Sequence, residues 1–199
     1  MNKKAIFTYG RLNPPTIGHH AMINELLRVA METGSDPYIV ITHTQNRKKN
    51  PLTVEEKRDL IERAYPGIPV LATSKNEPSP TYIQAKLKKN GYNNISMMVG
   101  SNRFNSGAFK WTGIPQLSAG VRNANENSGI TPSSASATKA RNAARNENLN
   151  SFAKLVPSND PMNLMRLIKS RLDPPNAQKE PKKPSINPTK TIRKRRAKK

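Results

Sequence analysis

Short runs of β-branched and aromatic residues alternate with helix-like segments along the first hundred residues of this chain. Four such runs occupy residues 5–9, 38–42, 70–72 and 95–99, and each is followed by glycine or polar residues that end a strand. Residues 53–56, Thr-Val-Glu-Glu, form a capping box that predicts a helix between the second and third runs. The alternation implies βαβ crossovers. The sequence therefore predicts an α/β fold with a Rossmann-like parallel sheet and flanking helices.

Helices are expected between these strand runs and after the last of them. They begin near Gly18 and Thr53, cover residues 80–90 and 138–145, and end with a last helix after Asp160-Pro161. Apolar stripes that include Met31 in the first helix and Met162 in the last helix are expected to face the core. Residues 104–137 are rich in Gly, Asn and Ser, and only residues 116–118 suggest a strand there.

Length and composition limit how many domains the chain can form. With 199 residues and 34% hydrophobic residues, we expect a single domain over residues 1–173 and a disordered Pro/Lys/Arg-rich tail over residues 174–199. The absence of cysteine excludes disulfides and thiolate metal sites. No apolar run is long enough for a membrane span or a signal peptide, so no membrane partner is expected and a cytoplasmic location fits.

The formal net charge of +21 is unevenly distributed. Residues 174–199 hold ten Lys/Arg, one Glu and five Pro, including the run Arg193 to Arg196. Such a segment is predicted to bind nucleic acid non-specifically through counterion release, although a solubilising tail or a nuclear-import signal would look the same. The remaining residues carry +12, which attracts phosphate on either a nucleotide or a nucleic acid.

A candidate phosphate-binding loop joins the first predicted strand to the first predicted helix, with the sequence Gly-Arg-Leu-Asn-Pro-Pro-Thr-Ile-Gly-His over residues 10–19. A loop that leaves a parallel strand and enters a helix aims backbone N–H groups at an anion. Gly18 permits close approach of that anion, and Thr16 and His19 are placed to donate to phosphate oxygens. Spacing alone slightly favours an ordinary turn, because short motifs match by chance.

The loop resembles the signature of the nucleotidyltransferase superfamily, the cytidylyltransferase-like proteins with an (H/T)xGH motif. Residues 16–19 fit TxGH, and residues 10–14 are similar to the GRFxP start of nicotinamide-nucleotide adenylyltransferases. Residues 135–141 resemble the family's ISSTxxR motif, residues 98–103 its VGSDR-like segment, and residues 48–56 its lysine-bearing loop and following helix. The shared order of these segments is more specific than any one motif, and the pattern is closest to small phage-encoded members.

The resemblance implies transfer of a nucleoside monophosphate from ATP, or CTP, to a phosphorylated small-molecule acceptor, with release of pyrophosphate. Magnesium would be bound through the nucleotide phosphates, with no metal site on the protein. Catalytic roles are implied for His19, Thr16, Lys48 (or its neighbour Lys49) and Arg141, and nucleotide-binding roles for Gly10, Arg11, Gly18, Gly100, Ser101, Ser136 and Thr138. If the chain is phage-encoded, its location is the host cytoplasm or the virion.

Departures from the family pattern keep an alternative open. Ala137 stands where a second serine is usual, and Asn102 stands where aspartate is common. The alternative is a catalytically weak protein with the nucleotide-binding fold that attaches to nucleic acid through its basic tail, inside a virus particle for example. Phe109 and Trp111 suit either stacking on an acceptor ring or packing. His20 and His43 form no visible metal triad, and His20 is expected to be a solvated helix residue.

Overall fold

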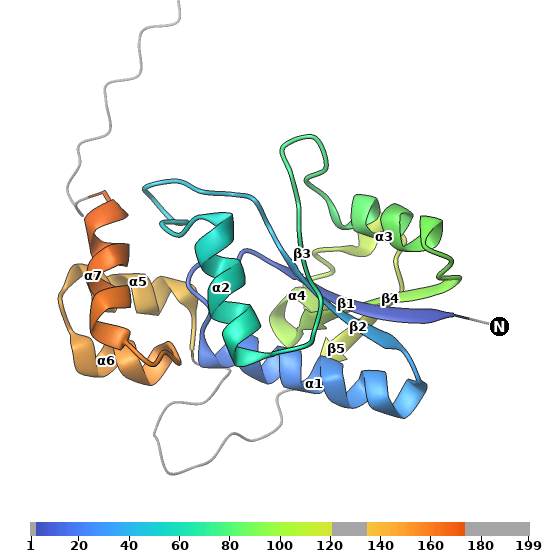
Figure 1. Ribbon diagram of the computed structural model, residues 1–199, viewed down its shortest axis with the longest axis horizontal. Helices are drawn as coiled ribbons and strands as arrows, with labels where there is room; N and C mark the ends of the chain where they lie inside the picture. Colours follow the sequence, from blue (N-terminus) through green and yellow to red (C-terminus); the bar gives the residue numbers. More distant parts are fainter. Residues whose placement is uncertain (1–2, 121–134, 174–199) are drawn as a thin grey trace, which may run out of the picture.

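A five-stranded parallel sheet forms the centre of the protein in a computed structural model, which describes residues 3–120 and 135–173 (Figure 1). The strands are β1 (Lys4–Gly10), β2 (Asp36–Ile41), β3 (Val70–Ala72), β4 (Asn94–Gly100) and β5 (Gln116–Ala119). Their order is β3-β2-β1-β4-β5, and every neighbouring pair is parallel. The predicted α/β Rossmann-like fold is therefore confirmed, and the weak strand signal near residue 116 is the fifth strand.

Helices pack on both faces of this sheet and beside it. They are α1 (Ile17–Thr33), α2 (Val54–Ala64), α3 (Pro80–Lys89), α4 (Ser101–Asn105), α5 (Ala137–Arg145), α6 (Leu149–Leu155) and α7 (Pro161–Arg171), with a short 3-10 turn η1 (Lys110–Thr112). Alternate strand residues point to opposite faces. Ile6 therefore packs with Leu26 of α1, whereas Phe7 packs with Ile83 of α3. Helices α1 and α2 cover one face, and α3 covers the other (Figure 1).

The capping box predicted for α2 is present. The Glu56 backbone N–H donates to Thr53 Oγ1 at 3.2 Å, and the Thr53 N–H donates to Glu56 Oε2 at 2.9 Å. These two bonds satisfy N–H groups that a helix start otherwise leaves unpaired. The capping box therefore sets where α2 begins, directly after the loop that follows β2.

Helices α5, α6 and α7 form a group of their own beside α2 and away from the centre of the sheet (Figure 1). They share one apolar cluster, to which Leu52 of the loop before α2 also belongs, and Leu60 of α2 packs against it. Helix α6 was not predicted, although its N-cap residue Asn148 accepts a hydrogen bond from the Ser151 N–H at 2.9 Å and is a start signal. Helix α4 was not predicted either, because five residues are too few to show a periodic pattern.

Two methionines expected in the core are exposed. Met31 in the last turn of α1 is 85% exposed, and Met162 in the first turn of α7 is 43% exposed. In α1 the preceding residue, Ala30, is buried instead, and in α7 the buried residue is Leu164, two positions later. Successive helical residues are about 100° apart around the axis, so a shift of one or two positions decides which side faces the core.

Two further expectations concern membrane spans and the C-terminal tail. Within the described ranges, no helix is both long enough and apolar enough to cross a bilayer. Residues 174–199, for which disorder was predicted, lie outside the described residues.

Candidate active site

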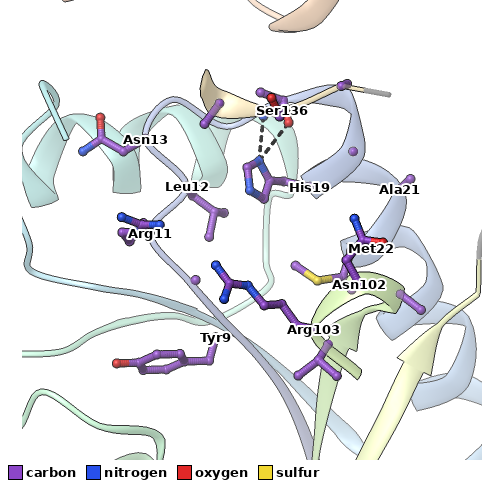
Figure 2. Close-up of a pocket in the computed structure, with 18 of the residues that line it drawn as sticks. Tyr9, Arg11, Leu12, Asn13, His19, Ala21, Met22, Asn102, Arg103 and Ser136 are labelled. Carbon is purple, nitrogen blue, oxygen red and sulfur yellow. Dashed lines mark hydrogen bonds between the residues drawn. The ribbon is translucent and has the colours of Figure 1, made fainter. Parts of the chain in front are cut away.

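A cleft of about 560 Å³ opens at the carboxyl ends of the central strands. Its walls come from the loop after β1, the first turns of α1, the ends of β4 and β5 and the start of α5 (Figure 2). Strand β1 has β2 on one side and β4 on the other, so the connections that follow these strands diverge above it. Open parallel sheets bind ligands at this kind of switch point.

The fold brings nearly all the predicted site residues together in this cleft. They are Gly10, Arg11, Thr16, Gly18, His19, Gly100, Ser101, Ser136, Thr138 and Arg141. Lys48 does not line it. The Lys48 side chain is exposed, and its backbone carbonyl accepts a hydrogen bond from Arg145 Nη2 at 3.2 Å. Its neighbour Lys49 is exposed as well and is also outside the cleft lining.

His19 presents one defined donor to the cleft. The Thr16 backbone N–H donates to His19 Nδ1 at 3.0 Å, and Thr16 Oγ1 lies 2.9 Å from the same nitrogen. Nδ1 is therefore an acceptor, and the proton of the neutral ring is on Nε2. Burial, with a smaller contribution from His20, lowers the pKa of His19 to about 4. At neutral pH the residue thus offers an uncharged Nε2–H donor.

Asn13 holds the phosphate-binding loop against two other segments. Its side chain is buried, with Nδ2 donating to the Leu52 carbonyl and Oδ1 accepting from the Leu52 N–H, both at 2.9 Å. Its carbonyl accepts from Arg141 Nη1 at 2.8 Å. Leu52 and Arg141, which lie 39 and 128 positions away in the sequence, are therefore both joined to Asn13, one through its side chain and the other through its backbone carbonyl. Because buried amide groups are costly to leave unpaired, these bonds fix the loop relative to α5.

The start of α5 supplies hydroxyl groups and a buried cation. Ser136 is the N-cap residue, and its Oγ accepts from the Lys139 N–H at 3.2 Å. Arg141 Nη2 donates to Thr138 Oγ1 at 3.0 Å, which leaves the Thr138 hydroxyl proton available to the cleft. Burial lowers the pKa of Arg141, and the positive charges of Arg11 and Arg145 lower it further. This mutual repulsion between cations would be relieved by a bound anion.

The end of β4 is open at Gly100, one of the residues for which the resemblance implies nucleotide binding. Gly100 has an ordinary φ of −62°, and a Cβ added to it would meet no protein atom within 4 Å. The fold itself therefore does not require glycine here, and the missing side chain leaves space in the cleft. The Ser101 hydroxyl donates to the Ala119 carbonyl at 2.7 Å, so it can offer a ligand only an acceptor.

Arg103 and Tyr9 line the cleft and were not predicted as site residues. Figure 2 shows the Arg103 guanidinium extending into the cleft between Tyr9 and the loop that carries Arg11. The signal for Arg103 was the VGSDR-like segment itself, whose arginine had no role assigned. Tyr9 is fixed by donation from its hydroxyl to the Pro78 carbonyl, and its ring packs edge-on against Phe109 at 5.9 Å.

The charged side chains among the described lining residues of the cleft are all positive. Three arginines line it, Arg11, Arg103 and Arg141, and no Asp or Glu is among its described lining residues. No group of three or more His, Asp or Glu that could hold a metal occurs in the part of the chain that the structure describes. The described lining residues therefore offer a polyphosphate several cationic and hydrogen-bonding partners.

The fold and the cleft define an α/β protein built to hold a phosphorylated ligand above the central strand. Residues 7–124 match the cytidylyltransferase-like family, which is more than half of the chain, and the chain belongs to that family. Membership implies a function of the nucleotidyltransferase type, with a nucleoside triphosphate as a substrate. The match ends before α5, so the second motif lies beyond it. None of the curated proteins compared with the chain matches it.

Proposed function

We propose that this protein transfers a nucleoside monophosphate, with adenylyl transfer favoured, from a nucleoside triphosphate to a phosphorylated small-molecule acceptor. An oxygen of the acceptor phosphate attacks the α-phosphorus, the bond from that phosphorus to the bridging oxygen breaks, and pyrophosphate leaves. No protein nucleophile is needed. Such a reaction requires mainly positioning of the reactants and stabilisation of charge in the transition state.

The observation that carries the proposal is the state of His19. Its ring is neutral, its tautomer is set by Thr16, and its Nε2–H is left as the donor in a cleft lined by cations. A preorganised donor of this kind stabilises negative charge as it develops on the α-phosphate oxygens. Thr16 acts as a positioning residue, because both of its contacts to the His19 ring end on Nδ1.

The other candidate site residues are assigned to the phosphates that leave as pyrophosphate. Ser136, Thr138 and Arg141 at the start of α5 are assigned to the β- and γ-phosphates, which become the leaving pyrophosphate. Arg11 is assigned to the same charge, and Lys48 would have to move toward the cleft to join it. Magnesium enters as part of the nucleotide substrate, since the cleft's described lining offers it no carboxylate.

Adenylyl transfer is favoured by the Gly-Arg start of the loop, which is similar to that of nicotinamide-nucleotide adenylyltransferases. The ring pair of Tyr9 and Phe109 beside Arg103 is consistent with an acceptor that carries a planar ring and a phosphate. CTP as the donor and acceptors without a ring are the competing choices. A panel of phosphorylated acceptors with ATP or CTP, followed by pyrophosphate release, decides among them.

Replacement of His19 by alanine tests the mechanism. We expect His19→Ala to abolish pyrophosphate release while circular dichroism and the nucleotide-induced rise in melting temperature stay close to wild type. The ligand shift persists because the phosphates are still held at α5. His20→Ala is the matched control, since His20 lies outside the cleft lining and stacks on Tyr65 at 5.4 Å. Full turnover in His19→Ala would rule the mechanism out.

A second candidate function is attachment to nucleic acid without efficient catalysis. It is favoured by the ten Lys/Arg among residues 174–199 and by the alanine and asparagine at positions 137 and 102. Absence of pyrophosphate release across the acceptor panel, together with tight salt-dependent binding to duplex DNA, would favour this candidate.

A further inference from the structure

Trp111, the only tryptophan of the chain, is 66% exposed in the short turn η1. It is not among the described residues that line the cleft or form the apolar clusters. Phe109, two residues earlier, does line the cleft and packs against the apolar cluster of β4 and α3. Stacking in the cleft and packing in the core, the two roles that suit both residues by sequence, therefore leave the position of Trp111 unexplained.

The segment that carries Trp111 is held in a fixed shape by its own backbone. We call residues 101–113, which comprise α4, η1 and the turn between them, the aromatic segment. The Gly107 N–H donates to the Phe104 carbonyl at 3.0 Å, and the Lys110 N–H donates to the Gly107 carbonyl at 3.1 Å. Phe104 is itself 40% exposed. The aromatic segment thus presents two large aromatic side chains to solvent, and exposed apolar groups gathered on one short segment mark an interaction surface.

Helix α3 lies on the same face of the sheet as the aromatic segment. Ile83 of α3 packs in one apolar cluster with Ile114, which follows η1, and Phe109, which precedes η1, packs against that cluster. Tyr82 of α3 is 48% exposed. All the aromatic side chains among the exposed large hydrophobic residues of the described chain therefore belong to α3 or to the aromatic segment.

The charge around these aromatic side chains is positive. Residues 78–120 hold five Lys/Arg and no Asp or Glu. Arg103 extends into the cleft (Figure 2). The other four are exposed lysines, none of which pairs with a carboxylate of the described residues: Lys86, Lys88, Lys89 and Lys110. Unpaired lysines beside exposed aromatic rings favour a partner that combines negative charge with planar groups.

We propose that the aromatic segment and the exposed side of α3 form a binding surface for single-stranded nucleic acid, with a base stacked on Trp111 and phosphates held by Lys110 and the lysines of α3. Aromatic rings that stack on bases and cations that follow the backbone are the two parts of such surfaces. The bases must be unpaired, because a duplex keeps their faces inside its own stack. The inference is independent of the proposed nucleotidyl transfer and of the tail over residues 174–199.

Other occupants fit this surface less well. In a symmetric contact with a second copy of the chain, the same four lysines would face each other, and each copy carries a net charge of +21, so repulsion opposes the contact. An acidic peptide would satisfy the lysines, but its carboxylates offer no ring face for stacking on Trp111. Single-stranded nucleic acid supplies both a chain of negative charges and planar bases.

Trp111 itself is the probe, because stacking on a base quenches indole emission and the chain has no other tryptophan. The full-length protein is titrated with an oligothymidylate of about 20 nucleotides, a length that covers one or more single-strand sites. We expect saturable quenching. A duplex of equal length, polyglutamate, and dTMP at the same nucleotide concentration should each leave the emission nearly unchanged, although the first two still meet the basic tail.

Variants separate stacking from charge. Trp111→Ala is expected to weaken oligothymidylate binding about tenfold and to leave duplex binding unchanged, whereas Trp111→Phe should keep most of the affinity. Lys110→Met should lower the slope of log affinity against log salt by about 0.7, the effect of losing one phosphate contact to a single strand. The matched controls are Met31→Ala, an exposed apolar residue of α1, and Lys154→Met, an exposed lysine of α6; neither should change single-strand binding.

The outcomes that overturn the surface are distinct. Oligothymidylate binding without quenching, or an equal loss of duplex and single-strand affinity in Trp111→Ala, would assign the binding to the tail alone. Quenching by dTMP would assign Trp111 to a mononucleotide site, and quenching by polyglutamate to an acidic partner. A blue shift of the emission with rising protein concentration, in the absence of nucleic acid, would assign the surface to a second copy of the chain.

Discussion

At the scale of single residues, the candidate site contains a histidine whose tautomer is set by a threonine. His19 is kept neutral and oriented by Thr16, and both residues come from the loop that the sequence singles out. The spacing of Thr16 and His19 is visible in the sequence, whereas the burial that lowers the pKa of His19 comes from the packing around the cleft.

The pKa of His19 links this site to the pH dependence of stability. In the unfolded chain the pKa is near the ordinary value of 6.5, and in the folded protein it is about 4. The folded state therefore resists protonation, and its stability falls as the pH drops from 6.5 toward 4. The loss from His19 should reach about 3 kcal/mol. Urea denaturation of wild type and His19→Gln across this range should show a steeper decline for wild type; parallel curves would contradict the shifted pKa.

Gly100 tests whether the open end of β4 receives the nucleotide. Gly100→Val should change the free energy of unfolding by no more than about 1 kcal/mol, because the backbone conformation is ordinary and a Cβ at this position would meet no protein atom within 4 Å. The variant should nevertheless lose most of the rise in melting temperature that ATP or CTP with magnesium produces. An unchanged ligand shift would place the nucleotide elsewhere.

At the scale of elements, the site depends on where loops and helices begin. The phosphate-binding loop lies between β1 and α1, and the second motif forms the first turn of α5. Asn13 and Arg141 join these two elements through one 2.8 Å hydrogen bond. The α5–α7 group also holds the lysine loop, because Arg145 donates to the Lys48 carbonyl and the Asp173 N–H donates to the Arg47 carbonyl.

The N-cap of α5 should therefore have two effects where an ordinary N-cap has one. Ser136→Ala is expected to lower the free energy of unfolding by about 1 kcal/mol and also to reduce the nucleotide-induced melting shift. Asp160→Ala is the matched control: Asp160 caps α7, accepts from the Asn163 N–H at 3.1 Å and lies outside the cleft lining. It should destabilise the protein similarly and leave the ligand shift intact. Equal ligand shifts in both variants would remove Ser136 from the site.

At the scale of the whole molecule, positive charge is the dominant property. The cleft carries three arginines without a carboxylate among its described lining residues, and residues 174–199 add ten more Lys/Arg beyond the last described helix. A small anionic ligand and a long polyanion would both be attracted, but to different parts of the chain. The two attractions can therefore be separated by truncation.

Removal of residues 174–199 should leave nucleotide turnover unchanged and weaken binding to DNA or RNA strongly. The tail's net charge of +9 provides counterion release without reading sequence, whereas the rest of the chain keeps +12 and some residual affinity. Fluorescence anisotropy on a random duplex at several salt concentrations should show a steeper salt dependence for the full-length protein. Equal affinity and equal slope in both forms would show that the tail is not a nucleic-acid anchor.

The sequence by itself determined the features that depend on near neighbours in the chain. Strand runs, the capping box at Thr53 and the loop motif over residues 10–19 are local patterns, and the structure has the fold that they predict. Short elements such as α4 were not predicted, because five residues are too few to show a helical period. Met31 and Met162 were misplaced because a shift of one or two helical positions decides which face is buried.

Only the tertiary structure decided what depends on residues far apart in sequence. Lys48, conspicuous in its motif, remains outside the cleft, while Lys57, an ordinary helix residue by pattern, is fully buried and its Nζ donates to the carbonyl of Thr42. Arg103 reaches the cleft although its motif suggested no role. The neutral state of His19 and the hold of Arg141 on Asn13 likewise follow from packing. The physical reason is that burial and hydrogen-bond partners are properties of an environment assembled by the fold, and no short segment contains them.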